Sequence, residues 1–208
     1  GNSSYGTAIV GTVSGTSISY GSEYVFESAE ADYTSTSFDP NTANKIVIAY
    51  RDGGNGNKGT AIVGTVSGTS ISSLSFGSQQ NASTVESNYV FMQYDPNTAG
   101  KFVVTYENRD NSEYGTAVVG TVSGTSCSFG STVVFNSGAT AFLSLSFDAN
   151  TANKIVISYQ DSGNSNYGTA VVGTVSGGSV TFGTPVVFES ANSIYISAVF
   201  DNNSNKVV

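Results

Sequence analysis

Histidine and tryptophan are both missing from this 208-residue sequence, and cysteine occurs only once. Without histidine there is no Ser-His-Asp triad and no histidine general acid or base. The same absence, with a single cysteine, excludes zinc sites of the usual His and Cys kind and any disulfide framework within the chain. The sequence therefore lacks the commonest catalytic and structural-metal machinery.

Basic residues are scarce as well. Seven Lys and Arg stand against 15 Asp and Glu, giving a net charge of −8. Nucleic acids and anionic membrane surfaces both select a basic patch, so we expect neither as a partner. No apolar run approaches the roughly 18 residues of a membrane-spanning helix, so no membrane insertion is predicted.

What the sequence does contain is a β-forming composition. Apolar residues make up 38% of the chain and charged residues only 11%, and Val, Ile, Thr, Tyr and Phe recur throughout. These residues favour strands, and no helical periodicity persists. An all-β fold with a hydroxyl- and amide-rich surface is predicted.

A ten-residue motif, GTAIVGTVSG or GTAVVGTVSG, occurs four times. It begins at residues 6, 59, 115 and 168. In the first complete repeat, strand one is Tyr33–Phe38, strand two is Lys45–Arg51, strand three begins at Gly59, and strand four runs from near Ile71 towards Thr84. Asp-Pro-Asn, Gly-Gly-Asn and Ser-Gly sequences supply the turns between them.

Four-stranded repeats of about 50 residues are typical of β-propeller blades. The motifs GTA[IV]VGTVSG and DPNTANKIVIAY resemble near-identical repeat arrays in large surface or tail-associated proteins of bacteria and their phages. The resemblance implies one propeller domain over residues 1–208, built of four-stranded antiparallel blades, in an extracellular, virion-surface or cell-surface setting.

The strands of the repeat that stand at the two ends of the chain determine whether the blades could close into a ring. The chain opens on strands three and four and ends on strands one and two. Pairing of these terminal strands would complete a fourth blade and close a four-bladed ring. The hairpin at that junction would be about six residues shorter than its equivalents, which indicates a piece of a longer chain with possible further blades.

Comparison of the repeats separates two sets of loops. The turns between strands one and two and between strands three and four hardly vary, whereas the two–three turns and the crossovers differ freely. We call these the uniform and the variable faces. Because binding residues concentrate on loops held by a rigid scaffold, the variable face is the candidate binding surface; drift after duplication is the alternative reading.

Aromatic residues recur where each crossover enters strand one: Tyr33, Tyr89, Phe142 and Tyr195. Such rings can stack on the apolar face of a sugar while neighbours such as Asp32 and Asn88 supply hydrogen bonds. Packing between blades is the other interpretation. A second aromatic set, five residues further on, is predicted to lie in the core: Phe38, Tyr94, Phe147 and Phe200.

One acidic residue recurs in every one–two turn: Asp39, Asp95, Asp148 and Asp201. A calcium ion requires several carboxylates, and each turn offers only one, so these residues are predicted to form Asx turns. No metal or cofactor is expected.

The second unit departs from the others. Ala82 stands where they have Phe26, Phe135 and Phe188, and a glycosylation sequon begins at Asn81. Cys127 aligns with apolar positions of the other repeats, so it is predicted to be a buried side chain rather than a reactive thiol.

The predicted function is a non-enzymatic extracellular binding module that recognises glycans or a surface protein. The alternative is a structural bead of a fibre, virion appendage or surface layer, contacting neighbouring subunits. Carboxylates that would be needed for glycoside hydrolysis, Glu30, Asp32 and Glu86, lie in crossovers of different repeats. An enzyme is therefore not expected.

Overall fold

The computed structural model describes residues 4–67 and 74–208. The described chain is all-β, with only two short 3₁₀ turns, at Gly53–Asn55 and Ser162–Asn164. The strands are β1 (Tyr5–Ser14), β2 (Ser17–Phe38), β3 (Lys45–Asp52), β4 (Lys58–Val66), β5 (Leu74–Phe76), β6 (Gln80–Tyr94), β7 (Lys101–Asn108), β8 (Tyr114–Ser123), β9 (Ser126–Phe129), β10 (Val133–Phe147), β11 (Lys154–Asp161), β12 (Tyr167–Ser176), β13 (Ser179–Phe182), β14 (Val186–Asn192), β15 (Phe200–Asp201) and β16 (Lys206–Val207).

Fourteen of these strands form one antiparallel network, because β2, β6 and β10 each pair with two different neighbours. The first part of β2 pairs with β1, and the part from Ala31 onwards pairs with β3. β6 and β10 behave in the same way. The predicted strand four of one repeat and strand one of the next are therefore a single continuous strand, because the crossover between them stays extended.

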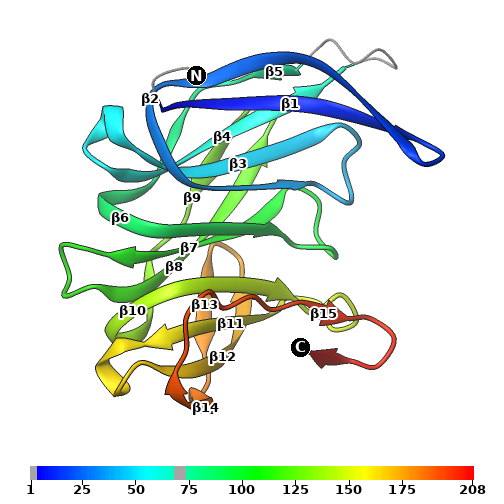
Figure 1. Cartoon of the computed structure of the whole chain (residues 1–208). Helices are drawn as coiled ribbons and strands as arrows, with labels where there is room; N and C mark the ends of the chain where they lie inside the picture. The colour runs from blue at the N-terminus through cyan, green and yellow to red at the C-terminus, as the bar shows by residue number, and fades with distance from the viewer. Residues whose placement is uncertain (1–3, 68–73) are drawn as a thin grey trace.

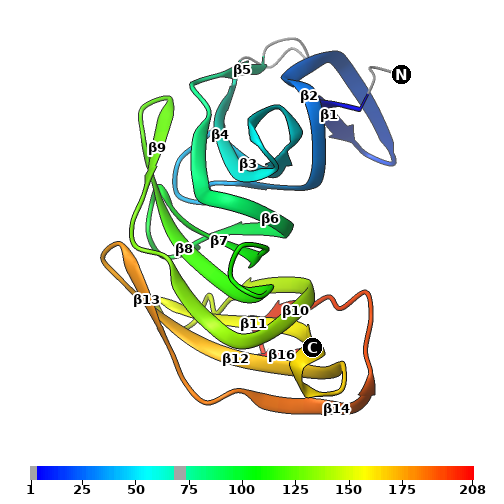
Figure 2. The ribbon, with the colours of Figure 1, turned by 90° about the vertical axis from the view of Figure 1, so that its left-hand side faces the viewer.

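We divide the array into units I to V. Unit I is β1 with the first part of β2; units II, III and IV are complete four-stranded repeats; unit V is β15 and β16 with the segment that precedes them. The units succeed one another from the N-terminus to the C-terminus, which lie at opposite ends of the array (Figures 1 and 2). The predicted strand four near Ile71 begins among residues outside the described ranges.

The core lies between the faces of neighbouring units and is formed by the central strands two and three. Side chains of β3, β7 and β11 such as Val47, Phe102 and Ile155 are completely buried. These strands read as continuous apolar runs because both of their faces are covered. Cys127 belongs to this core, as predicted, with 5% of its surface exposed.

The uniform face owes its constancy to a repeated set of hydrogen bonds. In every unit with a one–two turn the aspartate accepts a bond from the backbone N–H two residues later, as at Asp39 and Asn41 (2.8 Å), which confirms the Asx turns. The turn asparagine then bonds to the next unit's turn: Asn41 Nδ2 donates to Pro96 O at 3.1 Å. Its equivalents Asn97 and Asn150 do the same.

Lysines at the start of strand two form a second link between units. Lys45 Nζ donates to Thr65 Oγ1 across the sheet (2.8 Å) and to Gly124 O in the next unit (2.9 Å). Lys101 repeats both bonds, to Thr121 Oγ1 and Gly177 O. The residues of the uniform face are thus required by packing between units.

Unit II has one contact of its own. Gln79 Nε2 donates to Glu27 Oε2 at 2.7 Å and joins the outer strand of unit I to unit II. Ala82, in β6, is buried in the core shared with β7 although it replaces a phenylalanine.

The predicted closure of a four-bladed ring is not seen. In the described residues β15 and β16 pair only with each other, and β1 pairs only with β2, so the array is open. Two predicted core residues are affected by this: Phe38 is 60% exposed and Phe200 only half-buried, whereas Tyr94 and Phe147 are buried. Phe38 faces unit I, which has no strands one and two to cover it.

Candidate functional site

The four predicted binding aromatics lie in one continuous row across units II to V. Ring centroids are 5.1 Å apart for Tyr33 and Tyr89, 5.3 Å for Tyr89 and Phe142, and 5.2 Å for Phe142 and Tyr195. A cleft of about 250 Å³ runs along this row. The inner rings are half-buried, while Tyr33 and Tyr195 at its ends are 42% and 82% exposed.

Each aromatic of the row has a left-handed backbone conformation. The φ angles of Tyr33, Tyr89, Phe142 and Tyr195 lie between 48° and 53°. In units II to IV the ladder between strands one and two is also shifted at this point, as between Asp32 and Ser35. Bulky residues seldom adopt this conformation, and a bulge of this kind redirects a side chain. The backbone therefore aims all four rings at the same row.

One ion-pair network lies beside Tyr33. Arg51 Nη1 contacts Asp32 Oδ2 at 2.8 Å, and Arg51 Nη2 lies 3.8 Å from Glu86 Oε1. The sequence analysis placed Asp32 and Glu86 in crossovers of different repeats and did not predict that they lie close together. In the structure Arg51, at the end of strand two, contacts both carboxylates. The sequence signal for it is a basic residue at the end of strand two, where the equivalent positions hold Glu107 and Gln160.

A second network lies beside Tyr89. The predicted residue Asn88 donates to Glu107 Oε1 at 3.3 Å, and Arg109 Nη1 contacts Glu107 at 3.2 Å and also pairs with Glu113. Burial raises the pKa of Glu107, although Arg109 and Asn88 oppose this effect. Burial likewise raises the pKa of Tyr89, and the neighbouring Tyr33 and Glu107 add to the shift. The charged and amide side chains that border the aromatic row therefore lie mainly in units II and III.

The remaining candidate residues lie elsewhere. Glu30 lies against Gly53 and is not among the ion-pair partners of Arg51 in the described residues. Asn81 is exposed and accepts a bond from Asn55 Nδ2 at 2.7 Å. Among residues 4–67 and 74–208 no group of three or more His, Cys, Asp or Glu is placed to hold a metal ion, and no helix is long and apolar enough to cross a membrane.

Comparison with known proteins gives a likeness in fold. No family model matches the chain, and no curated protein matches it. Among solved structures, the chain is similar to a triple arginine-to-alanine mutant of AofleA from Arthrobotrys oligospora, with a TM-score of 0.55 and 11% identity. The match covers all of this chain and 65% of the AofleA chain, so this chain spans slightly less than two thirds of that protein.

Proposed function

We propose that the array is an arc of a β-propeller and that it acts as a non-enzymatic, extracellular glycan-binding module. Three complete four-stranded units, each joined to the next by a strand that leaves the outer edge of one unit and enters the inner edge of the following one, support the propeller arrangement.

The row of four left-handed aromatics is the observation that carries the binding function. Backbone strain at equivalent bulky residues is costly and concentrates at functional sites. The rings follow one another at centroid distances of 5.1–5.3 Å and border a common cleft. A ring presented in this way offers an apolar face to the C–H side of a sugar.

Polar groups beside the row suit sugar hydroxyls. Asp32 and Arg51 lie next to Tyr33, and Asn88 lies next to Tyr89. Carboxylate oxygens accept and guanidinium and amide N–H groups donate, so both roles of a hydroxyl are served. The charges are largely paired with one another, which favours a neutral ligand over an ionic one.

A glycan array followed by titration calorimetry tests the proposal. Tyr195→Ala and Tyr33→Ala are each expected to weaken binding up to about tenfold, because each removes one stacking ring. Tyr20→Ala is the matched control, since Tyr20 is 59% exposed and lies at the other end of β2. Absence of any glycan ligand, or equal affinity of the Tyr33→Ala/Tyr195→Ala double variant, would refute the proposal.

A second candidate function is that of a structural subunit in a surface assembly. The observation that favours it is the repeated bonding between units, in which Asn41, Asn97 and Asn150 each bond to the turn of the next unit. Near-identical units present equivalent surfaces, which suits repeated contacts in an assembly.

A further inference from the structure

The polarity of the aromatic row changes along its length. In unit II the residues before and after the ring are Asp32 and Thr34, both of them polar. In unit III they are Asn88 and Val90, one polar and one apolar. In units IV and V all the flanking residues are apolar: Ala141, Leu143, Ile194 and Ile196. A ligand that lies along the row therefore meets hydrogen-bonding groups at one end and aliphatic groups at the other.

The residues at the end of strand two follow the same gradient. Arg51 and Glu107 each contact the residue opposite them on strand one, beside the row. Gln160, their equivalent in unit IV, stands opposite Ala141. Its Nε2 donates to Ser193 O at 2.8 Å, just after β14, and the side chain is buried. The amide of unit IV is thus engaged within the protein, whereas the polar groups of units II and III border the row.

The cleft along the row has an apolar floor. Besides the four rings, it is bordered by Thr34, Val90, Phe91, Leu143 and Ile196, of which only Thr34 carries a polar group. Val90 and Leu143 are 3% and 7% exposed. A sugar hydroxyl placed against them would give up its bonds to water and gain no partner, which is unfavourable. The ligand group that covers this part of the cleft is therefore apolar.

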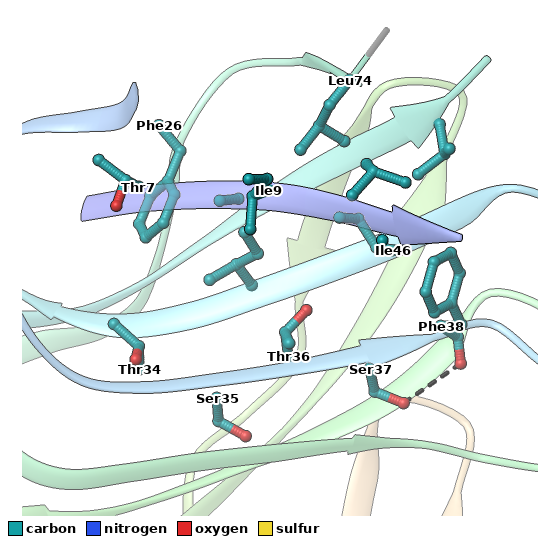
Figure 3. A pocket seen from close by; sticks show the side chains of 15 residues that line it. Thr7, Ile9, Phe26, Thr34, Ser35, Thr36, Ser37, Phe38, Ile46 and Leu74 are labelled. Atoms are coloured by element: carbon teal, nitrogen blue, oxygen red, sulfur yellow. Dashed lines mark hydrogen bonds between the residues drawn. The ribbon is translucent and has the colours of Figure 1, made fainter. Parts of the chain in front are cut away.

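A larger cleft lies between units I and II and differs in its lining. Its volume is about 410 Å³, and Figure 3 shows Thr34, Ile9 and Ile46 beside it. None of the four rings borders it, and neither does a charged side chain of the described residues. The row is the better ligand site, because it joins exposed aromatic faces, polar neighbours and an apolar floor within one small cleft.

We propose that the row selects an N-acetylhexosamine, whose hydroxyl groups face units II and III and whose acetyl methyl group covers the apolar floor at Val90 and Leu143. The inference rests on the proposed glycan-binding function and names the ligand class of that site. Neighbouring rings are 5.1–5.3 Å apart, so one sugar residue with its substituent contacts more than one ring.

An acetamido group has the chemistry that this lining requires. Its methyl group replaces water over the aliphatic side chains, which is favourable. Its N–H and carbonyl need one acceptor and one donor, and the hydroxyls of Thr34 and Tyr89 serve in both roles. The group is neutral, in keeping with the paired charges of Arg51 and Arg109. A free amine in the same place would bring a charge to the apolar floor, which opposes binding.

Three trisaccharides of one linkage test the inference. Chitotriose carries an acetamido group on every sugar, cellotriose carries a hydroxyl at the same carbon, and deacetylated chitotriose carries an amine. Titration calorimetry on the native chain is expected to show chitotriose binding at least about tenfold more tightly than cellotriose. Deacetylated chitotriose is expected to bind no better than cellotriose.

The outcomes separate this inference from the function on which it rests. Equal affinity for chitotriose and cellotriose overturns the selection of an acyl group and leaves glycan binding in place. A glycan array that shows only sugars without an acyl group has the same meaning. No binding of any glycan overturns both the inference and the proposed function.

Two variants locate the two ends of the sugar. Val90→Thr keeps the shape of the side chain and puts a hydroxyl on the floor, so the preference for chitotriose over cellotriose should fall several-fold. Asn88→Ala removes a partner of the sugar hydroxyls, so it should weaken both trisaccharides by the same factor. Val172→Thr is the matched control for Val90→Thr, because Val172 is 51% exposed and does not border the cleft.

Thermal melts accompany these titrations, because Val90 is buried. A Val90→Thr chain that melts like the native chain and keeps the native preference overturns the placement of the acetyl group. If that variant does not fold, the comparison of the three trisaccharides on the native chain still decides whether an acyl group is selected.

Discussion

Gly115, the first glycine of the repeated motif in unit III, provides the sharpest test of packing within a unit. A Cβ atom added there would lie 2.4 Å from Cε2 of Phe135. At the equivalent Gly59 the nearest atom would be 3.4 Å away, because Ala82 replaces the phenylalanine. The same substitution, Gly→Ala, is thus made twice in nearly the same sequence with opposite surroundings.

The expected magnitudes follow from these distances. The contact at Gly115 is about 1 Å shorter than ordinary van der Waals contact, and Phe135 is 5% exposed and held by Tyr159 and Phe182 at ring distances of 5.2 and 5.8 Å. Overpacking of this kind costs about 1–3 kcal/mol, or roughly 2–12 °C in Tm for a chain of this size. Gly59→Ala should be neutral or stabilising by up to about 1 kcal/mol, since alanine restricts the unfolded chain.

Urea denaturation of the two variants beside the native chain measures the difference. In a Phe135→Ala background Gly115→Ala should lose most of its cost, because the clashing ring is gone. Equal destabilisation by Gly115→Ala and Gly59→Ala, or an undiminished cost of Gly115→Ala without the ring, would refute the reasoning.

Two further predictions concern buried titratable groups. Burial first, and the nearby charge of Glu27 second, raise the pKa of Asp52, so its contribution to stability is present at low pH and is lost as the pH rises through that pKa. Asp52→Asn gives unit II the residue that unit III has as Asn108. The substitution should therefore raise Tm at neutral pH and raise it by less near pH 4. If thermal melts show the same change in Tm at both pH values, the pKa of Asp52 is not raised in the folded chain. Burial raises the pKa of Cys127 to about 11, so iodoacetamide should label it at pH 8 only in denaturant, and labelling of the folded chain at the denatured rate would refute its burial.

The sequence allowed the strands and turns of the interior units to be predicted because these depend on local chemistry. Strand two begins at Lys45 as predicted, and the aspartates form Asx turns with their own neighbours. The continuity of strand four with strand one was not predicted, since the polar crossover resembled a loop and its pairing partner lies far along the chain.

The errors arise where a residue depends on a neighbour that the chain does not provide. Phe38 has the same sequence context as the buried Tyr94, but no strands one and two of unit I cover it. At the candidate site the aromatic row follows from the repeat period, whereas the Arg51 pairs with Asp32 and Glu86 depend on loops that differ between units.

Near-identical units also raise the problem of mispairing during folding. A strand three from one unit fits the strand two of another almost equally well, which favours domain-swapped traps in repeat proteins. Within the described residues, the bond from Gln79 to Glu27 marks the boundary between units I and II, and the small Ala82 marks the boundary between units II and III. A chain that paired its units in the wrong order would leave the Glu27 carboxylate without the Gln79 amide, or would place a phenylalanine where there is room for a methyl group.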